Sequence, residues 1–311
     1  MKQKKENTKA KRNKTLEILP EEKIHLLKNI TSSADLNDSD VFGKIIHGDI
    51  VQVSEILPHA IADMLFIDPP YNLTKDFHGN IFYKKKPENY EKWFSEILLK
   101  LLPLLKPTAS VYVCSDWKSS YEIYNVISKH LIVRNRITWE REKGRGSLKN
   151  WKNCSEDIWF ATVSENYPFH ADRVKLKRRV IAPYVDNKGN PKDWEKSEQG
   201  NFRLTYSSNF WNDVTIPFWS MSENTDHPTQ KPEKLLAKLI LASTEENDVI
   251  LDPFLGSGTS AVTARKLNRR YVGIEAQLDY CLYAAKRLNI AEHDKSIQGY
   301  DGVFKERNSR I

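Results

Sequence analysis

The chain has few cysteines and no long apolar run. Cys114, Cys154 and Cys281 are odd in number and widely spaced among 311 residues, so the sequence indicates neither a disulfide framework nor a zinc site. We expect reduced thiols, a cytoplasmic location and no bound metal. No segment approaches the roughly 18 apolar residues of a membrane span, and the N-terminus lacks the apolar core of a signal peptide. We therefore expect no membrane partner.

Positive charge is concentrated in two segments of the chain. The formal net charge is +7. Residues 1–30 carry nine Lys and Arg against four Glu, and residues 141–210 carry fourteen Lys and Arg against nine Asp and Glu. Two basic zones on an otherwise mildly acidic body indicate a polyanionic partner such as nucleic acid, although a basic tail alone can simply aid solubility.

From Lys44 onward, short apolar runs alternate with segments of helical spacing. This alternation predicts an α/β fold, a doubly wound and mostly parallel sheet covered by helices. Before it, we expect one amphipathic helix over 16–30 and a loop over 31–39. The expected strands are 45–46, 64–67, 110–114, 248–251 and 270–274, and the expected helices are 90–102, 117–130, 232–240, 257–267 and 277–288.

An irregular segment interrupts this alternation between residues 141 and 226. It contains scattered glycines and prolines, and six of the eight tryptophans fall in or beside it. We interpret it as an insertion with a function of its own. The predicted organisation is a flexible basic arm (1–15), a catalytic domain in two segments (16–143 and 225–290), the insertion (144–224) and a tail (291–311).

The motif Asp68-Pro69-Pro70-Tyr71 directly follows the predicted strand 64–67. Ligands of open α/β sheets bind at the carboxyl ends of strands. The two prolines remove two backbone donors and leave carbonyl acceptors beside a carboxylate and an aromatic ring. The exocyclic amino group of a nucleobase needs this combination of acceptors and stacking surface. A rigid strand-to-loop turn is the alternative interpretation.

A second motif, from Asp252 to Ala261, also follows a predicted strand and opens a helix. Gly256 and Gly258 allow the backbone to approach a ligand closely, and Glu275 is placed to bind ribose hydroxyls. This spacing also suits NAD. However, Asp252 at the start of the loop would repel a pyrophosphate and attract an ammonium group. A nucleoside that carries an amino acid, such as S-adenosylmethionine, fits better.

Together with a third segment, His227-Pro228-Thr229-Gln230-Lys231-Pro232, these motifs resemble those of the amino-group DNA methyltransferases of restriction-modification systems. The catalytic motif precedes the cofactor motif, which resembles the β-class order. The resemblance runs from about Lys44 to Leu288. It implies the Rossmann-like fold of S-adenosylmethionine-dependent methyltransferases, with residues 144–224 as the target recognition region.

The resemblance also implies roles for individual residues. Asp68, Pro69, Pro70 and Tyr71 would be catalytic: Asp68 and the Pro69 carbonyl accept the amino hydrogens of an extruded base, and Tyr71 stacks on it. For Lys231, a solvated lysine at a helix start is the alternative to cofactor contact. The implied S-adenosyl-L-methionine site comprises Asp49, Ile50, Asp68, Lys231, Asp252, Pro253, Phe254, Gly256, Ser257, Gly258, Thr259 and Glu275.

Four basic residues of the insertion are candidates for contacts with DNA phosphates: Arg145, Lys177, Arg178 and Arg179. A basic strand that faces solvent is the alternative. The other partners to test are a cognate restriction endonuclease and a second copy of the chain.

Methylation of adenine N6 in duplex DNA is the predicted activity, because the cytosine-N4 members of the family often carry Ser where this chain has Asp68. Methylation of cytosine C5 would need a nucleophilic cysteine, usually after proline, which this sequence lacks. Cytosine N4, RNA or protein amide nitrogen as acceptor, and an inactive nucleic-acid-binding regulator with the same fold, remain as alternatives.

Overall fold

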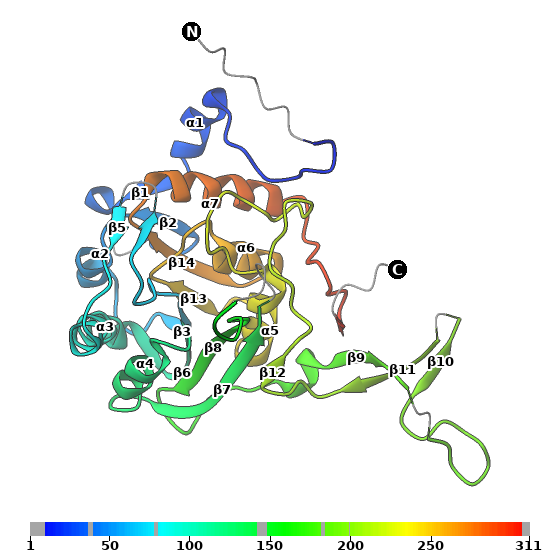
Figure 1. Ribbon diagram of the computed structural model, residues 1–311. Helices are drawn as coiled ribbons and strands as arrows, with labels where there is room; N and C mark the ends of the chain where they lie inside the picture. The colour runs from blue at the N-terminus through cyan, green and yellow to red at the C-terminus, as the bar shows by residue number, and fades with distance from the viewer. Residues whose placement is uncertain are drawn as a thin grey trace.

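The computed structural model describes residues 10–36, 40–77, 80–141, 148–181, 184–198 and 200–306. At its centre lies a nine-stranded sheet with the order β1-β2-β14-β13-β3-β6-β8-β7-β12 (Figure 1). Eight of these strands run in one direction, and β8 is antiparallel to both of its neighbours. The strands are β1 (Ile30–Ser32), β2 (Lys44–His47), β3 (Ala62–Ile67), β6 (Leu105–Ser115), β7 (Ile132–Glu140), β8 (Ser155–Thr162), β12 (Phe210–Trp211), β13 (Val249–Asp252) and β14 (Arg270–Glu275).

Helices cover both faces of this sheet because its central strands are apolar on both sides. In β3, Met64 and Phe66 join one apolar cluster, whereas Leu65 and Ile67 join the other. The predicted doubly wound, mostly parallel sheet is therefore confirmed. The first cluster includes α5 (Glu233–Ser243), α6 (Thr259–Lys266), α7 (Leu278–Ala291) and Leu26 of α1 (Pro20–Leu27), and the second includes α2 (Ile50–Ile56), α3 (Pro87–Leu101) and α4 (Ser120–Ile127).

A four-stranded sheet, β10-β11-β9-β15, extends from the body, with β10 and β11 farthest out (Figure 1). Its strands are β9 (Leu176–Arg179), β10 (Glu195–Ser197), β11 (Gly200–Thr205) and β15 (Phe304–Lys305). A separate hairpin is formed by β4 (Lys75–Phe77) and β5 (Asn80–Phe82), and short 3-10 helices span Ser33–Asp35, Leu102–Leu104 and Ala171–Val174.

Two predicted domain boundaries differ from the structure. The predicted insertion, 144–224, supplies β8 and β12 to the central sheet, so the projecting part is confined to β9, β10 and β11. The predicted tail, 291–311, contains β15, whose Phe304 is fully buried. Both differences arise from long-range strand pairing, which composition does not reveal.

The N-terminal segment also differs from the prediction. In the predicted arm, 1–15, residues 1–9 lie outside the described residues, but the Lys14 amide donates to the Trp219 carbonyl at 2.6 Å. The helix expected over 16–30 is limited to α1, which has Pro20 in its first turn, a position that suits proline. The loop expected over 31–39 begins with β1, which pairs in parallel with β2.

Candidate active site

A cavity of about 700 Å³ opens at the carboxyl ends of β2, β3, β13 and β14. Parallel strands end at the same edge of a sheet, so residues that are distant in sequence converge there. The lining contains much of both predicted motifs. The predicted site residues that line it are Asp49, Ile50, Asp68, Pro69, Pro70, Tyr71, Pro253, Phe254, Gly256 and Glu275.

Five predicted cofactor residues are buried behind this lining: Lys231, Asp252, Ser257, Gly258 and Thr259. The glycine loop turns inward after Gly256, against α7. There the Arg287 guanidinium donates to the Ser257 carbonyl and to the Thr259 hydroxyl, both at 2.9 Å. These contacts of Ser257 and Thr259 support the loop from the side away from the cavity.

The two glycines of the loop have different surroundings. Gly256 has φ +53°, and an added Cβ would lie 2.9 Å from Nε2 of His227, which also lines the cavity. Gly258 has φ +85°, and an added Cβ would lie 2.6 Å from Cβ of Ala284 on α7. Gly256 thus keeps the cavity wall open, whereas Gly258 allows α7 to pack closely.

Two carboxylates are held at the cavity by backbone amides. Glu275 accepts from the amides of Gly256 and Gln277, both at 2.8 Å, and burial raises the pKa of its carboxyl group. Asp49 caps α2 and accepts from the Val51 amide at 2.9 Å. Both are oriented to receive hydroxyl or amino donors from a ligand.

Asp252 is 3% exposed, and its two oxygens are both used internally. Oδ2 accepts from the Ser260 hydroxyl at 2.5 Å, and Oδ1 accepts from the Phe254 amide at 3.0 Å. Burial raises the pKa of this carboxyl to about 7. Asp252 therefore shapes the turn that Pro253 and Phe254 make into the cavity.

This raised pKa predicts a pH-dependent stability. The folded chain binds the Asp252 proton more tightly than the unfolded chain, so the stabilisation is full below the ordinary pKa of 3.8 and is lost as pH rises through about 7. Asp252→Asn can keep both contacts without a charge, because its oxygen can accept from the Phe254 amide while its NH2 group donates to the Ser260 hydroxyl oxygen. We expect it to melt on the order of 3–8 °C higher than the wild type at pH 8.5, with the gap closing toward pH 4. Calorimetry from pH 4 to pH 8.5 measures this difference in melting temperature. Equal slopes of melting temperature against pH for the two proteins would contradict a raised pKa of Asp252.

The predicted catalytic motif belongs to a buried polar cluster that also contains Glu156 and Lys231. Tyr71 places its hydroxyl 3.1 Å from both Asp68 Oδ1 and Glu156 Oε2. Nζ of Lys231 lies 2.6 Å from Asp68 Oδ2 and 3.3 Å from Glu156 Oε2. On its other side, Glu156 accepts from the Arg141 guanidinium, and Arg141 lines the cavity.

The two carboxyl groups of this cluster differ in protonation behaviour. Burial raises the pKa of Asp68, and the negative charge of Glu156 raises it further, against the opposing effect of Lys231. Burial also acts on Glu156, but Lys231 and Arg141 more than offset it, so the pKa of Glu156 is lowered. The carboxylates hold the pKa of Lys231 above its ordinary value despite burial. Lys231 thus contacts both carboxyl groups, at 2.6 Å from Asp68 and 3.3 Å from Glu156, and their surroundings move the two pKa values in opposite directions.

The two proline carbonyls of the motif also differ. The Pro70 carbonyl accepts from the Tyr90 hydroxyl of α3 at 3.0 Å. No residue in the described part of the chain donates a hydrogen bond to the Pro69 carbonyl. Pro69 is thus the carbonyl of this motif with free acceptor capacity.

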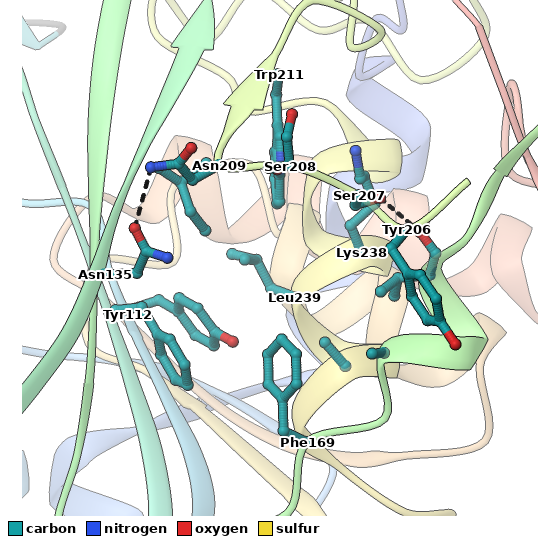
Figure 2. A pocket seen from close by; sticks show the side chains of 15 residues that line it. Tyr112, Asn135, Phe169, Tyr206, Ser207, Ser208, Asn209, Trp211, Lys238 and Leu239 are labelled. Carbon is teal, nitrogen blue, oxygen red and sulfur yellow. Dashed lines mark hydrogen bonds between the residues drawn. The ribbon is translucent and has the colours of Figure 1, made fainter. Parts of the chain in front are cut away.

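A second, smaller cavity of about 120 Å³ lies between β7, β8, α5 and the segment after β11. Figure 2 shows Tyr112, Phe169 and Leu239 around it, with Asn209 hydrogen-bonded to Asn135 at 3.1 Å. Its lining includes no residue predicted for the site. The chemistry-bearing residues therefore converge on the larger cavity.

The basic residues of β9 point in two directions, as alternation along a strand requires. Lys177 and Arg179 are exposed on one face, where Lys177 lies 4.9 Å from the ring centroid of Phe202. Arg178 is half-buried on the other face, with its Nε buried. Arg145 lies outside the described residues.

The described residues contain no group of three His, Cys, Asp or Glu side chains that could hold a metal ion. None of the helices in this part of the chain is both long and apolar enough to cross a membrane.

Known proteins resemble this chain in sequence and in structure. A family model described as DNA methylase matches residues 62–286. The chain is 30% identical over 256 residues to the DNA adenine methyltransferase YhdJ of Escherichia coli strain K12, covering 80% of this chain and 83% of that protein. It is 29% identical over 266 residues to the type II methyltransferase M.HpaI of Haemophilus parainfluenzae, covering 84% and 77%.

Two solved structures are similar in fold. The M1.HpyAVI–SAM complex has a TM-score of 0.53 at 21% identity, covering 79% of this chain and 98% of that chain. The cytosine-N4-specific PvuII DNA methyltransferase has a TM-score of 0.57 at 16% identity, covering 83% of this chain and 88% of that chain. Both likenesses support the Rossmann-like methyltransferase fold.

Proposed function

Because this chain belongs to the DNA methylase family, we propose that it transfers the methyl group of S-adenosyl-L-methionine to the N6 amino group of adenine in duplex DNA. One observation carries the proposal: Asp68, Pro69 and Tyr71 line the same cavity as the glycine loop and Glu275. A base and a methyl donor can therefore meet at one strand edge, where positioning supplies much of the acceleration.

The cofactor is S-adenosyl-L-methionine, which supplies a methyl group on a positively charged sulfur. The cavity suits it, because Glu275 and Asp49 offer oriented carboxylates and Gly256 leaves space that any Cβ would fill. We assign Glu275 to the ribose hydroxyls, and Asp49 and Ile50 to the adenine end. Asp252 and Gly258 support this binding through the shape of the loop.

The acceptor base is held by the catalytic motif. Asp68 and the free Pro69 carbonyl accept the two amino hydrogens, which localises the nitrogen lone pair toward the methyl carbon. Tyr71 has its hydroxyl anchored on Asp68 and Glu156, so its ring is fixed as a stacking surface for the extruded base.

Adenine is favoured over cytosine by Asp68 at the first position of the motif and by the E. coli relative named as an adenine methyltransferase. The test uses labelled S-adenosylmethionine with DNA, RNA and protein as separate acceptors, followed by digestion of the DNA to nucleosides. We expect label only in DNA, as N6-methyladenine. Label in 4-methylcytosine would refute the base assignment, and label only in RNA or protein would refute the substrate class.

The projecting strands β9, β10 and β11 are the part of the predicted insertion that we propose as the target recognition region. Lys177 and Arg179 share one exposed face of β9, which suits contact with DNA phosphates. Replacing both by Ala should weaken binding to unrelated duplexes alike and reduce the slope of log affinity against log salt by about two. Affinities of two unrelated duplexes at several salt concentrations measure this slope.

Two controls accompany that measurement. Lys100→Ala with Lys129→Ala removes two exposed lysines paired with glutamates on the body, and should leave the slope unchanged. Arg178→Ala should lower the melting temperature rather than the slope, because its side chain is half-buried. An unchanged slope in the Lys177 and Arg179 double variant would mean that this face does not contact DNA. A loss confined to one duplex would mean that it reads bases.

Similarity to type II methyltransferases supports a wider biological proposal. We propose that the protein is the modification enzyme of a restriction-modification system, acting in the cytoplasm beside a cognate endonuclease. A homodimer is also proposed, and light scattering of the purified protein tests it.

A further inference from the structure

We propose that Glu156 is a positioning residue for methyl transfer: its permanent negative charge divides Lys231 and Tyr71 between two carboxylates, and so keeps Asp68 able to accept a proton. This inference rests on the proposed function. It concerns a residue outside the three motifs, on β8, the strand that runs against its neighbours.

Both carboxylate oxygens of Glu156 have polar partners. Its side chain is 3% exposed, and an uncompensated carboxylate at this depth would be costly. Oε1 accepts from Arg141, while Oε2 faces both the Tyr71 hydroxyl at 3.1 Å and Lys231 Nζ at 3.3 Å. Glu156 therefore reaches both groups that hold the oxygens of Asp68.

The chemistry of the reaction requires a proton acceptor. As N6 forms its bond to the methyl carbon, the carbon–sulfur bond breaks and its electron pair stays on sulfur. The nitrogen then carries a positive charge and must lose one hydrogen as a proton. Asp68 takes that proton and later releases it to water. Two neighbouring carboxyl groups whose pKa values are driven apart are typical of such a division of roles.

Removing the negative charge of Glu156 would lower the proton affinity of the Asp68 carboxylate. The ammonium group of Lys231 would then pair with the Asp68 carboxylate without competition from the charge of Glu156, which would hold Asp68 in the ionised form and make it a weaker base. The other ionisable groups around this pair are Arg141, Cys114 on β6 and Asp252 on β13, and none of them supplies a replacement anion beside Lys231 on the β8 side.

The test compares Glu156→Gln with the wild type in single-turnover methylation of genomic DNA from a host without adenine methylation, over a range of pH. We expect a rate at least ~10-fold lower at neutral pH. The acidic limb of the rate profile should move to lower pH, because the anion that raises the pKa of Asp68 is gone. Affinity for S-adenosylmethionine should stay within about twofold, since Glu156 does not line the cavity.

Glu165→Gln is the matched control, because it removes a carboxylate that is 79% exposed a few residues beyond the end of β8. Its rate and pH profile should match the wild type. Glu156→Asp keeps the negative charge and should retain the acidic limb of the wild-type rate profile. This variant can still be measured if Glu156→Gln does not fold.

Three outcomes would overturn the proposal: an unmoved acidic limb in folded Glu156→Gln, a rate loss explained by weaker cofactor binding, or an acidic limb displaced in Glu156→Asp. If the wild type itself does not methylate adenine, the proposed function fails instead, so the two failures are distinguishable.

Discussion

Asp68→Ala should lower the rate of methyl transfer at least ~100-fold while S-adenosylmethionine affinity stays within a few-fold. The variant loses an acceptor for the amino hydrogens and the group that takes the released proton. Both interactions are made mainly in the transition state, so the loss should fall on the rate. In addition, Lys231 and the Tyr71 hydroxyl would turn to Glu156 alone, which would displace the ring that we assign to base stacking.

Single-turnover rates and calorimetric titration with S-adenosylmethionine separate these effects. Asp40→Ala is a suitable control, because it removes an aspartate that is 71% exposed and far from the motif in sequence. A parallel loss of cofactor affinity and rate in Asp68→Ala would show that Asp68 belongs mainly to the cofactor site.

Substitution of the two loop glycines by valine should produce two different defects. Gly256→Val places a branched side chain against the His227 side chain in the cavity wall and strains a left-handed backbone, φ +53°. We expect a less stable but still folded protein whose S-adenosylmethionine affinity falls at least ~100-fold. Gly258→Val directs its Cβ into Ala284 of α7, where the backbone itself is 2.9 Å away. Together with the left-handed φ, this clash should destabilise the fold by about 3 kcal/mol or more.

Urea unfolding and cofactor titration on both variants distinguish these outcomes. Gly273→Ala offers a comparison, because its added Cβ would meet only the Leu255 side chain among the nearest atoms, which can move. If both loop variants unfold alike, Gly256 is a structural glycine and not part of the binding surface.

The sequence was sufficient to identify candidate site residues whose role depends on their local context. Asp68 and Gly256 each follow a buried strand, and parallel strands end at one edge, so their meeting in one cavity follows from order along the chain. Gly258 has the same local signal as Gly256. Its different role is set by Ala284, which approaches from a helix later in the chain.

Glu156 and Arg141 could not be identified in this way. Arg141 lies at the edge of the irregular, glycine-rich segment and Glu156 lies inside it. The importance of both depends on β8 inserting between β6 and β7. Lys231 was identified from the sequence, but its contact with Asp68 could not be, because that contact joins the segment just before α5 to the residue after β3. The separation of Arg178 from Lys177 and Arg179 follows from strand alternation once β9 is known to be a strand.

The most direct test of the account is modified-base sequencing of DNA from a methylation-free host that expresses this protein, beside a culture that expresses Asp68→Ala. We expect N6-methyladenine at one short sequence throughout the genome with the wild-type protein, and a near-complete loss of it with the variant. Detection of 4-methylcytosine alone, or of no modified base although the protein is folded and binds S-adenosylmethionine, would contradict it.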